Sequence, residues 1–489
     1  MAFSFYWHDY ETFGLDPRAD RPAQFAGQRT DPELNLVEEP LELWCRLSPD
    51  YLPDPVSCGL TGIGPDAVER LGVRERDFIT AIHAQMARPE TCSCGYNSLR
   101  FDDELTRSTL YRNLIDPYGR EWQNGNSRWD LLDALRLARA FRPEGMEWPD
   151  GEDGAPSFRL ELLTAANGIP HAQAHTALAD VRATIALARK LKAAQPRLWE
   201  YALKARSKHW VRNQVDPAHP QVLIHVSGMF KAAQGAFALV WPLGDLPGRP
   251  NEIALWDLRH PFEPFLDLDV ETLRQHLFQS SEDLARQGRE RLPAKTLHTN
   301  RCPIVVRDLR LLTPAVAERY QVDLPAAQAR GARLEAQGGF RARVLEAMEA
   351  SFPPASDPDF ALYGGFFGNQ DRATLDRISR TPPAALAGLK PAFRDPRLGE
   401  LFFRYRARNW PETLTGPERA RWEAHCLARM AQAPAKGLLD RAAFQASLKA
   451  CRERRPDQNE LWAELEAYAS GCPVPAIPGR TAGPPPGCA

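Results

Sequence analysis

The first residues of the chain alternate between apolar and polar positions in the way that a buried β-strand does. Phe3, Phe5 and Trp7 recur at every second position, and aromatic side chains favour a pleated strand. Asp9 and Glu11 follow at the same spacing. Because residues i and i+2 of a strand point to one face, these carboxylates are predicted to project into the same space. An Asp-x-Glu pair alone is more often solvated, so the pair needs partners elsewhere in the chain.

Similar patterns continue through the first 195 residues. They predict further strands at 23–30, 41–47 and 91–96, and helices at 67–71, 77–86 and 102–114. A turn signal at 31–35 joins the second and third strands, which indicates an antiparallel meander. Strands that alternate with helices are typical of an α/β layer fold, in which a site gathers at the strand ends.

Two further groups of residues could complete a site with Asp9 and Glu11. Asp102 and Asp103 open a predicted helix, where acidic side chains commonly interact favourably with the helix dipole. At a strand-to-helix junction one of them could instead face the first pair, and Asp102 is preferred because it follows the apolar anchor Phe101.

Asp180 falls on the packed face of a later helix, an expensive place for an unpaired carboxylate that a metal would explain. His175 precedes it by five residues and could accept a proton near neutral pH, although a lone His-x4-Asp is usually a surface pair. Arg159 is more often a solvated helix charge, but near this site it could hold a phosphate.

These motifs together resemble a known family. Asp9-x-Glu11, Asn97-x3-Phe101-Asp102 and His175-x4-Asp180, in this order, resemble the motifs of the DEDDh 3′ to 5′ exonucleases, the DnaQ-like branch of the ribonuclease-H-like fold. More narrowly, the chain is similar to the bacterial exodeoxyribonuclease I family over most of its length. That likeness is carried by segments 7–14, 21–25, 95–97, 126–130, 156–160 and 406–409.

Length, patterning and the resemblance together predict three domains. The chain has 489 residues, too many for one core. We expect an α/β ribonuclease-H-like exonuclease domain at 1–195, an SH3-like β-barrel domain with a helical insertion at 196–352, and an α-helical C-terminal domain at 353–470. The tail at 471–489 is rich in Pro and Gly and is expected to be disordered.

The resemblance implies a processive exodeoxyribonuclease that hydrolyses single-stranded DNA from 3′ to 5′, releases 5′-mononucleotides and serves DNA repair and recombination. It implies that Asp9, Glu11 and Asp180 hold two Mg²⁺ ions, for which Mn²⁺ can substitute, and that Asp102 completes the acidic shell. His175 would orient and deprotonate the attacking water. The residues implied to contact the terminal nucleotide are Glu11, Thr61, Asn97 and Arg159.

Composition and the start of the sequence bear on the expected cellular location and partners of the protein. The net charge of −2 neither supports nor excludes a nucleic-acid partner. The chain starts without a signal-peptide pattern and has no apolar run long enough to span a bilayer, and its nine cysteines lack metal-ligand spacing. We therefore expect a cytoplasmic protein with no membrane partner. The resemblance further implies a monomer that binds the acidic C-terminal tail of the single-stranded-DNA-binding protein.

Three alternatives stay open at this point. The enzyme could prefer RNA, because no single residue of the sequence indicates that a substrate with a 2′-hydroxyl would be excluded. The chain could be a non-catalytic scaffold that binds single strands, although its intact set of clustered acids argues against this. Residues 401–410 interleave aromatics with arginines, which is typical either of a helix with an aromatic core face and a solvated arginine face or of a cationic groove with stacking platforms for bases.

Overall fold

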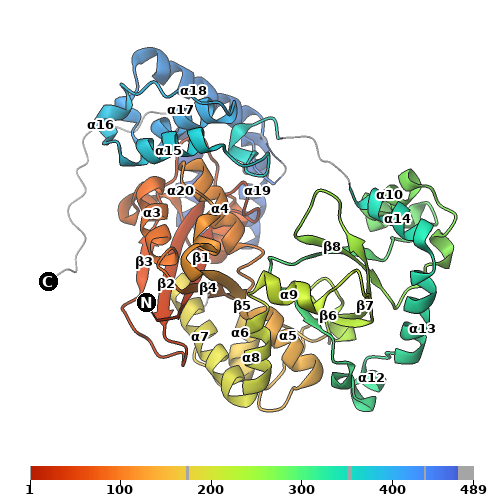
Figure 1. Ribbon diagram of the computed structural model, residues 1–489. Helices are drawn as coiled ribbons and strands as arrows, with labels where there is room; N and C mark the ends of the chain where they lie inside the picture. The colour runs from red at the N-terminus through yellow and green to blue at the C-terminus, as the bar shows by residue number, and fades with distance from the viewer. Residues whose placement is uncertain are drawn as a thin grey trace.

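The computed structural model describes residues 2–152, 154–171, 176–349, 355–433, 435 and 437–471. These residues form three domains (Figure 1), which we call the N-terminal, central and C-terminal domains. The central domain lies to the right of the N-terminal domain in this view, and helices of the C-terminal domain lie above the N-terminal domain. No helix among the described residues is both long and apolar enough to cross a membrane.

The N-terminal domain is built on one mixed sheet with the order β3-β2-β1-β4-β5. β1 pairs antiparallel with β2, as β2 does with β3, whereas β1–β4 and β4–β5 are parallel. The predicted meander and α/β layering are therefore confirmed, while β5 adds a strand that the pattern did not predict. The strands are β1 (Ser4–Thr12), β2 (Pro22–Thr30), β3 (Leu41–Trp44), β4 (Thr91–Gly95) and β5 (Ser127–Asp130).

Helices cover both faces of this sheet. Phe5 and Trp7 of β1 share a buried core with Val181 and other residues of α7 (Ala177–Ala194). Tyr6 and Tyr10 point the other way, into a core formed with α3 (Glu75–Met86) and α4 (Asp102–Arg112). The remaining helices of this part of the chain are α1 (Pro55–Thr61), α2 (Pro65–Leu71), α5 (Leu131–Phe141), α6 (Leu160–Ala166), α8 (Pro196–Lys204) and α9 (Lys208–Gln214).

The central domain is an antiparallel meander with the order β10-β6-β7-β8-β9. Its strands are β6 (Leu223–Val226), β7 (Phe237–Asp245), β8 (Glu252–Asp257), β9 (Ala294–His298) and β10 (Ile304–Val306). The predicted helical insertion lies between β8 and β9 as α10 (Val270–Phe278) and α11 (Ser281–Arg286). Three helices follow the sheet, namely α12 (Pro314–Arg319), α13 (Leu324–Glu335) and α14 (Gly338–Met348).

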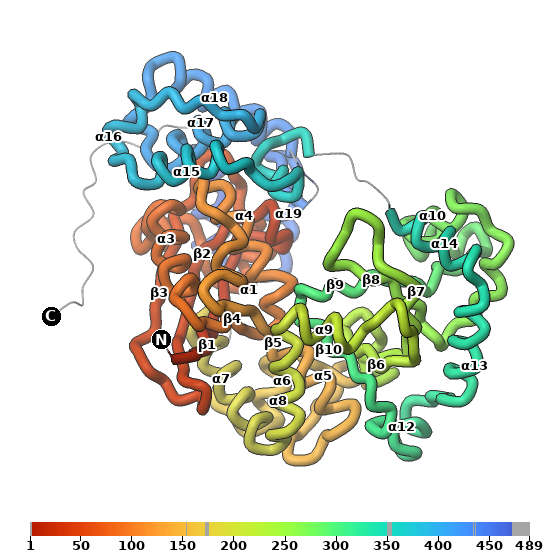
Figure 2. The backbone as a smooth tube through the Cα atoms, in the orientation of Figure 1, coloured from red at the N-terminus to blue at the C-terminus, as the bar shows by residue number. Residues whose placement is uncertain are grey.

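The C-terminal domain is helical and returns to the N-terminal sheet domain, as the tube in Figure 2 shows. Its helices are α15 (Asn369–Arg380), α16 (Pro383–Leu386), α17 (Arg397–Asn409), α18 (Gly416–Ala431), α19 (Arg441–Arg454) and α20 (Asn459–Gly471). Trp462 and Leu465 of α20 share a buried core with Tyr51 and Cys58. A Cβ atom at Gly59 would lie 2.7 Å from the Trp462 ring, so glycine permits this close approach of α1 and α20.

Helix α17 settles the two interpretations of residues 401–410. Leu401, Phe402 and Tyr405 lie in a buried core, as the structural interpretation predicts. The arginines are not solvated, however, because Arg404 and Arg406 are buried and paired with acids. Arg408 is likewise paired, with Asp50 of the N-terminal domain. These side chains therefore join parts of the protein and do not form an open cationic groove.

Candidate active site

Three carboxylates meet where β1 ends and α7 begins. Asp9 and Glu11 lie on the face of β1 that α7 covers, because side chains two residues apart on a strand share a face. Asp180 is in the first turn of α7. The Ala177 N–H donates to the Gln24 side chain of β2 at 3.4 Å, which ties the start of α7 to the strand beside Glu11. One oxygen from each carboxylate lies within 4.8 Å of the others.

A fourth carboxylate, Asp102, lies beside this group. It opens α4 and is only 4% exposed. The Tyr10 hydroxyl is 2.9 Å from the Thr106 hydroxyl, which holds α4 against β1. Burial, reinforced by the negative charges of Asp102, Glu11 and Asp180, raises the pKa of Asp9 well above its usual range. Burial also raises the pKa of Asp102 and, together with Asp180, raises the pKa of Glu11 to about 7.

The adjacent Asp103 has a different environment. Its carboxylate accepts from Arg120 at 2.7 Å and from Arg128 at 3.1 Å. These two guanidiniums outweigh the effect of burial and lower the pKa of Asp103 far below its usual range. Asp102 therefore belongs with Asp9 and Glu11, whose pKa values are also raised, whereas Asp103 forms an ion cluster with two arginines. As consecutive helical residues, the two side chains point in directions about 100° apart, which separates the two roles.

His175 falls in residues 172–175, which lie outside the described residues. A different histidine, His171, contacts Asp180 through its Nε2 atom, and its Nδ1 atom is 3.2 Å from the Thr164 hydroxyl of α6. Sequence reasoning missed His171. Its spacing from Asp180 matches no familiar pattern, and the only available signal is its place just after α6, in the segment that leads to α7.

Besides Glu11, the three other predicted nucleotide contacts lie on separate elements. Arg159 precedes α6 with its guanidinium exposed and 3.8 Å from Glu161. Thr61 ends α1, where its hydroxyl donates to the Ser57 carbonyl at 3.1 Å. Asn97 has a positive φ of 60°, which asparagine tolerates better than most residues, and its N–H donates to Asp130 at 2.9 Å. This turn leads the chain from β4 to α4. The roles of all three in binding stay predictions.

Comparison with family models covers nearly the whole chain. Residues 6–188 match a model described as an exonuclease, residues 206–350 the SH3-like domain of exonuclease I, and residues 356–472 its C-terminal domain. The domain limits predicted at 195, 352 and 470 lie near these ranges but remain predictions at the level of single residues. Exodeoxyribonuclease I of Escherichia coli K12 is 43% identical over 424 residues, which cover 86% of this chain and 89% of the relative. The chain belongs to the exodeoxyribonuclease I family.

Other members of the exodeoxyribonuclease I family agree with this assignment. The Haemophilus influenzae enzyme is 39% identical over 466 residues, covering 95% of this chain and 97% of that one. The structure of a moderately thermophilic exonuclease I from Methylocaldum szegediense superposes with a TM-score of 0.90 at 45% identity, covering 96% of this chain and all of that one. E. coli exonuclease I bound to a dA16 oligonucleotide gives a TM-score of 0.90 at 40% identity, with coverage of 96% and 100%.

Membership of the exodeoxyribonuclease I family confirms the predicted fold class and order of domains. The N-terminal domain is the exonuclease domain, the central domain is SH3-like, and the C-terminal domain is helical. The protein is therefore a 3′ to 5′ exonuclease, and the scaffold interpretation is set aside. The exonuclease domain and its group of carboxylates together imply dependence on a divalent metal.

Proposed function

We propose that this enzyme removes 5′-mononucleotides processively from the 3′ ends of single-stranded DNA, in DNA repair and recombination. The observation that carries the proposal is the group of four carboxylates, Asp9, Glu11, Asp102 and Asp180, whose mutual repulsion is visible in the raised pKa values of Asp9 and Glu11. Relatives of the same fold crystallised with dA16 and dT13 oligonucleotides support DNA as the substrate.

The residues fit a divalent metal. Hard carboxylate oxygens within 4.8 Å of one another are suited to Mg²⁺ or Mn²⁺, and positive charge would relieve the repulsion that raises the pKa values. We propose Mg²⁺ as the ion, with Asp9, Glu11 and Asp180 holding two ions and Asp102 completing the acidic shell. When bound, such ions would supply Lewis acidity and a more acidic water. A related exonuclease I structure is described as a zinc-bound form, so Mg²⁺ must be tested against other ions.

We assign the remaining roles in phosphodiester hydrolysis to side chains of the protein. Asp180 is held by the contact from His171, which orients one of its oxygens. His175 is proposed to take a proton from the attacking water, which suits an imidazole with an ordinary pKa near neutrality. Arg159 is exposed, and we propose that it binds a phosphate oxygen. Glu11, Thr61 and Asn97 are proposed to contact the terminal nucleotide.

The proposed partners follow from the same relatives. A related structure is described as an SSB and exonuclease I complex with an inhibitor, which supports a protein partner in the single-stranded-DNA-binding protein. We propose that the tail of that protein binds this chain and that the enzyme acts as a monomer in the cytoplasm.

The decisive experiment compares matched 5′-labelled oligomers of single-stranded DNA, duplex DNA and RNA. Purified protein with Mg²⁺ is expected to shorten single-stranded DNA from the 3′ end to mononucleotides, and EDTA or Asp9→Ala should abolish this. Preference for the RNA oligomer would contradict the proposed substrate, and activity that survives both controls would contradict the proposed metal site.

A further inference from the structure

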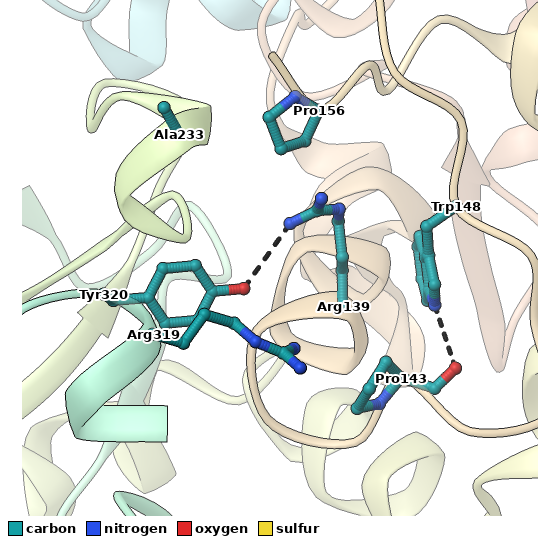
Figure 3. A pocket seen from close by; sticks show the side chains of 7 residues that line it. All are labelled: Arg139, Pro143, Trp148, Pro156, Ala233, Arg319 and Tyr320. Carbon is teal, nitrogen blue, oxygen red and sulfur yellow. Dashed lines mark hydrogen bonds between the residues drawn. The ribbon is translucent and has the colours of Figure 1, made fainter. Parts of the chain in front are cut away.

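The exonuclease domain meets its two neighbouring domains in different ways. At the boundary with the SH3-like domain, residues of both domains, Arg139 and Tyr320 among them, line a cavity of about 280 Å³ (Figure 3). At the boundary with the C-terminal domain, Trp462 of α20 is buried and packs so closely on α1 that a Cβ atom at Gly59 would lie 2.7 Å from its ring. A close-packed boundary transmits displacements, so α20 can fix the position of α1.

The last turn of α1 is capped by the C-terminal domain. The Gly59 carbonyl lies in this turn, where carbonyl groups have no partner within their own helix. The Ile63 N–H, which would bond to it if the helix continued, donates to the Thr61 hydroxyl at 3.2 Å instead. The Gly59 carbonyl accepts from the Arg455 guanidinium at 2.6 Å and from the Gln458 amide at 3.1 Å. Two side chains from the turn between α19 and α20 therefore complete the end of α1.

The first turn of α2 is capped from the same part of the C-terminal domain. Gly64 precedes α2 and has no side chain that could accept from the free N–H groups of this turn. The Asp66 N–H donates instead to the Glu464 carboxylate of α20. A carboxylate at the N-terminal end of a helix also interacts favourably with the helix dipole. The C-terminal domain thus holds both sides of the segment that joins α1 to α2.

This joining segment exposes residues 60–62, which we call the tip. Leu60 is 55% exposed, and a Cβ atom on Gly62 would have no neighbour within 4 Å among the described residues. The φ of 71° at Gly62 turns the chain back toward the interior. Ile63, the next residue, is buried in the core that contains Trp462. The tip, with Thr61 at its centre, is therefore open on one side and anchored on the other.

The tip is also fixed relative to the acidic site. The Phe13 carbonyl, two residues after Glu11, accepts from the Asp54 N–H at 2.7 Å and from the Tyr51 hydroxyl at 2.9 Å. The Asp54 carboxylate, which caps the start of α1, accepts from the Ser447 hydroxyl of α19 at 3.4 Å. Helix α1 is therefore attached at its start to the end of β1 and along its length to α19 and α20.

We infer that Arg455, Gln458 and Glu464 of the C-terminal domain are positioning residues of the exonuclease reaction, which hold the tip against the 3′-terminal nucleotide. This inference rests on the proposed function, in which Thr61 contacts that nucleotide. A misplacement of about 1 Å can cost on the order of 10²-fold in rate, so the support of the tip matters for the chemical step. The C-terminal domain thereby takes part in the reaction without touching the substrate through these three residues.

The first test separates the rate of hydrolysis from binding. Single-turnover removal of the first nucleotide is measured on a 5′-labelled dT oligomer, and binding of the same oligomer is measured by anisotropy in EDTA. Arg455→Met is expected to lower the rate by about 5- to 20-fold and to change Kd by less than about 2-fold, because the other nucleotides keep their contacts. Arg455→Lys keeps a donor for the Gly59 carbonyl and should recover much of the rate. Arg452→Gln, at an exposed pair with Glu466, is the matched control and should behave as wild type.

The second test shows whether the loss is specific to the terminal nucleotide. An oligomer with an abasic 3′-terminal residue is compared with one that ends in thymidine. Loss of the base should slow the wild type more than it slows Arg455→Met or Glu464→Ala, because in these variants the tip is already displaced. An equal loss in wild type and variants would indicate a general structural role and would overturn the inference, as would a wild type that removes both ends at one rate.

The third test acts on the contact between α1 and α20. Gly59→Ala places a methyl group against the Trp462 ring, so α1 must shift and the single-turnover rate should fall by about 3- to 10-fold. Trp462→Phe removes the ring atoms nearest to Gly59, and adding it to Gly59→Ala should cost less than the two separate losses predict. Fully additive losses would contradict the inference.

Failure of the inference and failure of the proposed function are distinguishable. If the wild type degrades single-stranded DNA and Arg455→Met removes the first thymidine at the wild-type rate, the inference is wrong and the proposed function survives. A wild type that degrades no single-stranded DNA would overturn both.

Discussion

Two buried groups of acids in this protein have nearly the same local geometry and opposite electrostatics. Asp9, Glu11 and Asp180 bring ligand atoms within 4.8 Å of one another, and so do Asp50, Asp359 and His425. In the second group Arg408 donates to Asp50 at 2.7 Å and to Asp359 at 3.0 Å. The neighbouring arginines lower the pKa values of Asp50 and Asp359 well below the usual range. In the first group, the pKa values of Asp9 and Glu11 are raised instead.

The difference shows that the distances between acids do not define a metal site. Arginines placed by α17 and α18 already neutralise the second group, which therefore joins the exonuclease and C-terminal domains. In the first group, the described residues pair no arginine with Asp9 or Glu11, and burial and mutual repulsion raise the pKa values of both. Asp102 and Asp103 repeat the contrast between adjacent residues, since only Asp103 has two arginine partners. Uncompensated charge is the physical property that distinguishes the catalytic candidate.

The largest expected effect is on turnover. Asp180→Asn removes a proposed metal ligand and should lower kcat by about 10³-fold or more, while binding of single-stranded DNA is retained. Its thermal stability without metal should equal or exceed that of the wild type, because repulsion with Asp9 and Glu11 is relieved. Single-turnover assays, anisotropy and thermal denaturation measure the three quantities. Substantial residual turnover would count against the role of Asp180.

The same substitution in the second group should have the opposite outcome. Asp359→Asn removes the buried negative charge that Arg404, Arg408 and Arg429 share and puts an amide donor in its place. Breaking such a buried cluster typically destabilises by about 3–5 kcal/mol. Denaturant titration should show this loss, whereas kcat of the folded enzyme should stay near that of the wild type. Asp308→Asn, at an exposed pair with Arg310, is the control and should leave stability unchanged. Equal stability of Asp359→Asn and wild type would remove the proposed distinction.

The pH dependence of stability gives a third test. Glu11 has its pKa raised from 4.5 to about 7 in the folded protein, so it contributes stability that is present below pH 4.5 and is lost as the pH rises through 7. The loss should be on the order of 3 kcal/mol in metal-free protein. Glu11→Gln should flatten this part of the profile, and saturating Mg²⁺ should stabilise the wild type more at higher pH. A wild-type profile that matches Glu11→Gln between pH 5 and 8 would refute this explanation.

Local pattern was enough to predict much of this structure. The period-two spacing of Phe5, Trp7, Asp9 and Glu11 predicts a shared face, and β1 has it. The short strand β5 was not predicted, because Ser127–Asp130 shows no alternation and is buried by its neighbours. The sequence left open whether the arginines of α17 form a solvated face or a cationic groove, because the partner of Arg408, Asp50, lies far away in the sequence. Buried ion pairs between distant segments leave no local signal.

The candidate site shows the same limit. Asp9, Glu11, Asp102 and Asp180 could be selected by pattern and family likeness, and the structure brings them together. The contact of His171 with Asp180 depends on how α6 and α7 lie relative to each other, which neither spacing nor periodicity reveals. The part played by His175 stays a prediction, since it lies outside the described residues.

The smallest expected effect concerns this contact. The Thr164 hydroxyl, His171 and Asp180 form a chain in which the imidazole holds one oxygen of a proposed metal ligand. Loss of such a supporting partner typically weakens metal affinity or activity by about 10- to 100-fold. His171→Ala should therefore raise the Mg²⁺ concentration needed for half-maximal rate by about 10-fold, with much of the rate recovered at saturating Mg²⁺. His171→Gln can still donate to Asp180, so its half-maximal Mg²⁺ concentration should lie between those of the wild type and His171→Ala. No such recovery occurs with Asp180→Asn, because there the ligand itself is lost. A His171→Ala enzyme whose Mg²⁺ dependence matches the wild type would show that the contact does not position Asp180 for metal.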